Sequence, residues 1–342
     1  MMTLRILTGL WLLLLSNFVA ADEIELNPGH PETYTVVKGD TLWEIAARFL
    51  QNPWQWPEIW HDNPQIRNPH WIYPGDLIAL SYVDGKPRLQ VERPSEVRLS
   101  PQIRVSPIEQ AIPVIPMNAI RPFLTHPKVV NTGELDQAPY LVDFAGEHVV
   151  GGAGDRIYVR AIDDDKTAGY MIFRPGQAYR DAETGEILGY EALYVADAEL
   201  QNTGDPATLL LTATDRETLI GDRLLPIEQE KVQVRYEPHA PAKPIQGHII
   251  SVVDGVTQIG QYQVVVIDRG VADGIETGHV LEIYQSGRTQ RDVVSRRSGE
   301  AVNLPHEKAG LLMVFRPFER VSFALVMKST RAVHLLDAVQ TP

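Results

Sequence analysis

The side chains that could act in catalysis or bind a metal do not form a recognisable motif in this sequence. Ten histidines occur, but none forms the H-x-H or H-E-x-x-H spacing that brings imidazoles and a carboxylate to one zinc ion. There is no cysteine, which removes thiolate nucleophiles, thiolate metal sites and disulfides together. The G-x-S-x-G motif of serine hydrolases is absent. The chain has 44 acidic residues, so the sequence leaves open a pair of catalytic carboxylates of the kind that glycosidases use. The sequence therefore predicts no metal site, no cofactor and no enzyme.

Two polar clusters suggest a bound ligand but fit a structural role better. Gly151–Gly154 is glycine-rich like a phosphate-binding loop, yet it lacks the Lys-Ser/Thr pair of a P-loop and precedes a strand-like segment. Asp163–Asp165 lacks the alternating spacing of a calcium loop. Both clusters are interpreted as turns.

The strongest local signals lie in residues 34–80. Thr41 and Glu44 have the spacing of a capping box, and the apolar residues after them recur at helical intervals. Strand-like Tyr34–Val37 precedes this helix, a second short helix fits Trp56–Asn63, and Leu77–Leu80 closes the segment. The predicted order is strand, helix, helix, strand (βααβ).

This segment resembles the LysM family. The resemblance is carried by V-x-x-G-D-T-L-W-x-I-A at residues 36–46, then Asn63-Pro64, then I-x-P-G-D-x-I at residues 72–78. It implies a βααβ module that binds the N-acetylglucosamine backbone of peptidoglycan or chitin in a shallow groove between two loops. Mapped onto this chain, the implied glycan-binding residues come from those two loops. They are Gly39, Asp40, Thr41, Leu42, Asn63, Ile66, Trp71, Ile72 and Tyr73.

Several of these residues have a structural alternative. Asp40 could favour the helix N-terminus by charge alone, and Thr41 could act only as a cap. Leu42 is expected in the core, whereas Trp71 and Tyr73 could either pack or stack on a sugar. The clearest physical match is Gly39, because a residue without a side chain lets a ligand approach the loop amides closely.

The N-terminal residues suggest an exported protein. Residues 1–21 combine Arg5, an apolar run and small residues at Val19–Ala21, which is the pattern of a cleaved signal peptide; an uncleaved anchor is the alternative. No later stretch is apolar enough to cross a membrane, so the mature protein is expected in the periplasm and not in the membrane. A net charge of −13 argues against a nucleic-acid partner.

Beyond the first module the pattern changes twice. Residues 86–127 are rich in proline and are predicted to be an extended spacer, although Ile112–Ile115 could dock on the next domain. Residues 139–238 and 245–338 are predicted to be two mostly β units that repeat the same order of segments. The predicted fold class is therefore α+β, and a helical lysozyme-like hydrolase does not fit the C-terminal half.

The β region adds a second resemblance. Its phrase Asp181–Gly189, followed by apolar strands, resembles the C-terminal β domain of the flagellar assembly protein FlgT. A signal peptide, one LysM module, a spacer and such a β region together resemble the TsaP family of type IV pilus secretin-associated proteins. That resemblance implies a non-catalytic protein that tethers the outer-membrane secretin to peptidoglycan. An adaptor for another envelope complex is the alternative, followed by a LysM-tethered wall hydrolase.

Overall fold

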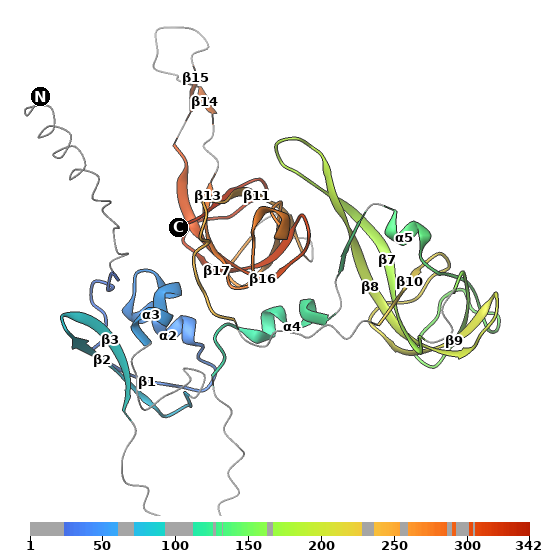
Figure 1. The fold of residues 1–342 in the computed structure, drawn as a ribbon, viewed down its shortest axis with the longest axis horizontal. Helices are drawn as coiled ribbons and strands as arrows, with labels where there is room; N and C mark the ends of the chain where they lie inside the picture. Colours follow the sequence, from blue (N-terminus) through green and yellow to red (C-terminus); the bar gives the residue numbers. More distant parts are fainter. Residues whose placement is uncertain are drawn as a thin grey trace, which may run out of the picture. The chain divides into compact units, whose positions relative to one another are not determined.

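The structure is a computed structural model that describes most of the chain (Figure 1). The chain divides into two compact units, residues 1–112 and 113–342. The described residues are 24–60, 72–92, 112–125, 128–131, 133–162, 167–227, 236–253, 259–285, 289–291, 301–303 and 305–342. The predicted signal peptide lies outside them. Within these residues no helix combines the length and apolar character needed to cross a bilayer.

The first unit is a three-stranded antiparallel sheet with short helices. In chain order its elements are β1 (Thr33–Thr35), α2 (Leu42–Phe49), η1 (Pro53–Gln55), α3 (Trp56–Trp60), β2 (Leu77–Val83) and β3 (Lys86–Glu92). The strand order is β1-β2-β3, so the two strands of the predicted βααβ module are direct neighbours. The hydrophobic side of α2 is buried, with Ile45, Ala46 and Phe49 at most 1% exposed.

The start of α2 follows from its sequence. The Thr41 hydroxyl accepts a hydrogen bond from the Glu44 amide at 3.2 Å, and the Glu44 carboxylate accepts one from the Thr41 amide at 3.1 Å. This reciprocal pair satisfies two of the amides that a helix leaves unpaired at its N-terminus. The predicted capping box is therefore confirmed.

The predicted spacer, residues 86–127, contains a strand and a helix among its described residues. Its first residues form β3, which pairs with β2 from Lys86 to Glu92. Pro87 is compatible with this strand because β3 lies at the sheet edge, where one side of the strand needs no amide donor. The end of the spacer forms α4 (Met117–Thr125), a nine-residue helix that contains Pro122. A single proline removes one helical hydrogen bond without preventing so short a helix.

The apolar segment inside that region binds back to the first unit. The Ile112 amide donates to the Ile72 carbonyl at 2.9 Å. This contact fixes the chain leaving the first unit beside Ile72, one of the residues assigned to the glycan site. Residues 93–111, which connect β3 to Ile112, lie outside the described residues.

The second unit begins with a closed six-stranded sheet. Its elements are β4 (Lys128–Val130), α5 (Glu134–Gln137), β5 (Tyr140–Phe144), β6 (Arg156–Arg160), β7 (Gly169–Arg180), β8 (Ile187–Asn202), β9 (Ala207–Thr214) and β10 (Arg223–Pro226). The pairing runs β5-β6-β9-β8-β7-β10 and returns to β5, while β4 adds to the edge of β8. Its core is made of inward-facing residues such as Leu141, Ile172 and Leu209, all 0% exposed.

A closed barrel follows in the same unit (Figure 1). This part of the chain contains β11 (Gln246–Val252), β12 (Val264–Ile267), η2 (Val271–Asp273), β13 (Val280–Gln285), β14 (Thr289–Arg291), β15 (Ala301–Asn303), β16 (Glu307–Pro317), β17 (Ser322–Ser329) and β18 (Ala338–Gln340). Strands β14 and β15 pair with each other in a separate two-stranded sheet. The barrel order is β11-β12-β17-β16-β13-β18. Replacing β5–β10 by β11, β12, β13, β16, β17 and β18 in chain order reproduces every pairing of the first closed sheet. The repeat predicted from the sequence is thus present in the strand pairing.

The two repeats share details of turn and bulge as well. Before β10 the Asp222 carboxylate accepts from the Leu219 amide at 2.8 Å, and before β18 the Asp337 carboxylate accepts from the His334 amide at 2.8 Å. The register of β5 shifts between Leu141 and Asp143, as that of β11 does between Ile249 and Ser251. Such turns, in which the fourth residue accepts from the amide of the first, recur through this protein.

The hairpin between β7 and β8 contacts the barrel through charged groups. Asp181 lies 3.2 Å from the Arg269 guanidinium, and Glu186 pairs with Arg320 at 2.8 Å. The Ala182 amide donates to the buried Asp268 carboxylate at 3.3 Å. These bonds join the first closed sheet to the barrel within the second unit.

Candidate functional site

The loop between β1 and α2 is a tight turn closed by Asp40. The Asp40 amide donates to the Val37 carbonyl at 3.2 Å, and the Asp40 carboxylate accepts from the Val37 amide and the Tyr34 hydroxyl, both at 2.9 Å. Gly39 adopts a φ of +103°, a backbone region that favours glycine. Asp40 is 8% exposed, so its carboxylate serves the turn.

A second turn of the same kind lies before β2. The Asp76 carboxylate accepts from the Tyr73 amide at 3.0 Å, and Gly75 has a φ of +97°. The two turns are tied together, because the Val36 amide donates to the Asp76 carbonyl at 2.9 Å and the Gly75 amide to the Val36 carbonyl at 2.8 Å. Two sequence-distant G-D motifs thus meet at one end of the module.

Free backbone donors remain on the first loop. Among the described residues, the amides of Gly39 and Leu42 have no acceptor. Gly39 is exposed, and an added Cβ there would meet no heavy atom of a described residue within 4 Å. Gly39 is exposed whereas Leu42 is 3% exposed, so of these two amides that of Gly39 is the better placed to pair with the carbonyl of an amide-bearing ligand.

Tyr34 lies on one side of this loop. Its ring lies under the Arg48 guanidinium, 4.4 Å from the ring centre. Burial raises the pKa of the Tyr34 hydroxyl, and the hydrogen bond to the Asp40 carboxylate raises it further. The hydroxyl therefore stays protonated and acts as a fixed donor to Asp40.

The structure places six of the nine predicted glycan-binding residues. Gly39 is exposed and Tyr73 half-buried, whereas Asp40, Thr41, Leu42 and Ile72 have buried side chains. Any contact that these four buried residues make with a glycan must therefore involve mainly their backbone atoms. Asn63, Ile66 and Trp71, in the second loop, lie outside the described residues. The first wall of the predicted groove is described, and Tyr73 marks the described end of the second.

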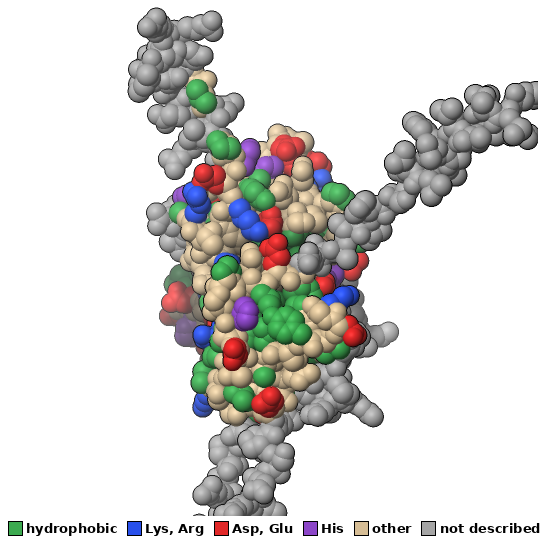
Figure 2. All heavy atoms as spheres, turned by 90° about the vertical axis from the view of Figure 1, so that its left-hand side faces the viewer, with side chains coloured by type: hydrophobic (Ala, Val, Ile, Leu, Met, Phe, Trp, Pro, Cys, Tyr) green, Lys and Arg blue, Asp and Glu red, His purple; other side chains and the backbone are tan. Residues whose placement is uncertain are grey.

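The three described tryptophans between α2 and β2 are packed inside. Trp54, Trp56 and Trp60 are 6%, 2% and 5% exposed, as expected for side chains that build the core of a small domain. On the face drawn in Figure 2, acidic and basic side chains are interspersed around a central group of hydrophobic ones. The described side chains on that face form no extended patch of one charge.

Residues 34–81 match the family model of the LysM domain. LysM domains bind peptidoglycan and other glycans that contain N-acetylglucosamine, and they occur in wall-associated, extracytoplasmic proteins. A 60-residue stretch is 42% identical to a Bacillus subtilis (strain 168) protein named "Uncharacterized protein YqbP". That match covers 15% of this chain and 27% of the other. Neither match indicates a catalytic family.

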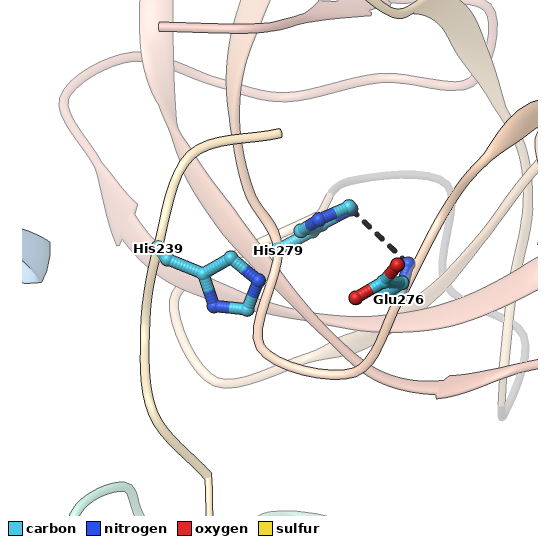
Figure 3. A group of neighbouring side chains, drawn as sticks. All are labelled: His239, Glu276 and His279. Carbon is cyan, nitrogen blue, oxygen red and sulfur yellow. Dashed lines mark hydrogen bonds between the residues drawn. The ribbon is translucent and has the colours of Figure 1, made fainter. Parts of the chain in front are cut away.

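The sequence predicted no metal site, whereas the structure brings together one cluster of side chains that could hold a metal ion. His239, Glu276 and His279 lie together in the second unit, with one ligand atom from each within 4.8 Å of the others (Figure 3). No short motif joins them, since His239 is far from the other two in the sequence. Strand pairing alone brings them together.

Proposed function

We propose that this protein is a non-catalytic, wall-binding protein of the bacterial envelope whose LysM module holds peptidoglycan glycan strands. The observation that carries the proposal is the exposed loop at Gly39, whose amide has no acceptor among the described residues, beside a capped helix and inside a segment that matches the LysM family. An N-acetyl group presents one carbonyl acceptor, one amide donor and a methyl group. Loop amides can pair with the first, and the half-buried Tyr73 offers a ring for stacking against the C–H face of a sugar.

The glycan contact is expected to be weak for a single module. A shallow loop buries little area, so most of the gross interaction energy offsets the cost of association. Several copies fixed on one multimeric partner would raise the effective concentration of modules and make the tether firm. This favours a role in which the second unit binds a multimeric envelope complex.

For that partner we propose the outer-membrane secretin of a type IV pilus, with the protein in the periplasm after removal of residues 1–21. Support comes from the sequence resemblance to the TsaP family and from the order of the domains. The two closed sheets of the second unit supply a large surface for such a partner or for self-association.

The proposal that the LysM module binds glycan is tested by NMR titration of the full chain with chitin oligosaccharides. Amide shifts are expected at residues 38–43, and cello-oligosaccharides, which lack the N-acetyl group, should produce none. Equal shifts with both sugars, or shifts only in residues 113–342, would refute it.

The partner is tested separately by co-purification from envelopes that contain the secretin. Recovery of the secretin with a variant lacking residues 34–81 supports the second unit as its binding part. Recovery of a different envelope complex in its place would overturn the secretin assignment while leaving the glycan site standing.

A further inference from the structure

The cluster of His239, Glu276 and His279 lies where the chain enters the barrel. His239 belongs to the segment between β10 and β11, and the other two belong to the loop between η2 and β13. In Figure 3 the side chain of His279 lies between those of His239 and Glu276. His239 and Glu276 are exposed, whereas His279 is buried.

The backbone fixes both histidines relative to each other. The His239 amide donates to the Gly278 carbonyl at 3.1 Å, and the Val280 amide donates to the His239 carbonyl at 2.9 Å. This parallel bridge places the two rings edge to face, with centres 4.8 Å apart. Only glycine suits position 278, because a Cβ there would lie 2.4 Å from the Glu237 carbonyl oxygen. The close approach of the segment to the loop is thus built into the chain.

The ring of His239 has the tautomer that a metal-binding histidine needs. Its Nδ1 lies 2.8 Å from the Glu237 carbonyl oxygen, which can only accept, so Nδ1 carries the proton. The lone pair is therefore on Nε2. A carbonyl that holds the Nδ1 proton in this way is the usual outer partner of a metal-binding histidine.

His279 replaces the usual acceptor of a recurrent turn. In the turn Glu276–His279, Nδ1 of His279 accepts from the Glu276 amide at 3.1 Å, the place taken by a carboxylate at Asp40, Asp76 and Asp222. A carboxylate would close the turn equally well. An imidazole adds a second nitrogen, Nε2, which takes no part in the hydrogen bond of the turn.

We propose that His239, His279 and Glu276 bind a divalent transition-metal ion of the zinc type. Two imidazoles and a carboxylate suit zinc, cobalt or nickel better than magnesium or calcium, and water would complete the coordination shell. The ion clips the segment before β11 to the loop before β13. Binding moves the proton of His279 from Nε2 to Nδ1, so the Glu276 amide must turn away. That rearrangement makes the site weaker than a fully preformed one.

The test is titration of the full chain, treated with chelator, with Co²⁺, followed by visible absorption and calorimetry. Wild type should bind one ion per chain at this site. His239→Gln and Glu276→Gln change exposed side chains and should each weaken binding at least tenfold. His306→Gln, which changes another exposed histidine, is the matched control and should leave binding unchanged. Absence of a one-to-one complex, or equal affinities of His239→Gln and wild type, would overturn the proposal.

Discussion

Replacement of Gly39 by alanine should weaken glycan binding more than it harms the fold. At a φ of +103° an L-residue is strained, and the expected cost is about 1–2 kcal/mol of unfolding free energy of the first unit. No clash adds to this cost, since the new Cβ meets nothing within 4 Å. Relief of the strain would turn the loop amides away from their present directions. Loss of one such hydrogen bond, about 1 kcal/mol, corresponds to roughly fivefold weaker binding.

Gly85 provides the matched control for this variant. It lies in the turn between β2 and β3 with a φ of +78°, and its Cβ would also meet nothing within 4 Å. Gly85→Ala should therefore destabilise the unit by a similar amount without touching the loop. Stability is read from hydrogen exchange of the α2 amides, and binding from co-sedimentation with purified peptidoglycan at several concentrations. If both variants lose binding equally, or neither does, the assignment of the site to the Gly39 loop is refuted.

The remaining predictions concern stability. The Thr184 amide, which donates to the Asp181 carboxylate, holds the pKa of Asp181 at about 2, below its ordinary value of 3.8. The folded-state pKa is the lower one, so this stability is complete above about pH 5 and is lost as the pH falls toward 2. Asp181→Asn should flatten that part of a urea-unfolding pH series, by about 1–2 kcal/mol; an unchanged slope contradicts it. Thr41→Ala should cost about 1 kcal/mol by loss of the cap, seen as faster exchange at the start of α2, and exchange at the wild-type rate would contradict it. Asp222→Ala should cost about 2–3 kcal/mol, because it removes the 2.9 Å partner of the partly exposed Arg174 and the acceptor of the Leu219 amide. Thermal unfolding checks this, and a shift no larger than that of an exposed Asp→Ala change would contradict it.

Features that depend on neighbours in the chain were readable from the sequence. The capping box at Thr41 and the glycine turn at Gly39 are local, since a few consecutive residues decide backbone angle and hydrogen bonding. The segment order of the two β units was also readable, because strand length and turn residues recur. The role of Asp40 was not, since its two partners, the Tyr34 hydroxyl and the Val37 amide, are defined only once the turn has closed.

Tertiary structure alone decided features that join distant segments. Proline density predicted a spacer at residues 86–92, but a neighbouring strand with unpaired edge groups recruits that segment into the sheet despite Pro87. Equally, nothing in the spacing of the histidines indicates that His239 meets His279. Pairing between strands is a long-range choice that depends on which edges and faces are left free. Local pattern fixes what each segment can form, whereas the folded chain fixes which segments become neighbours.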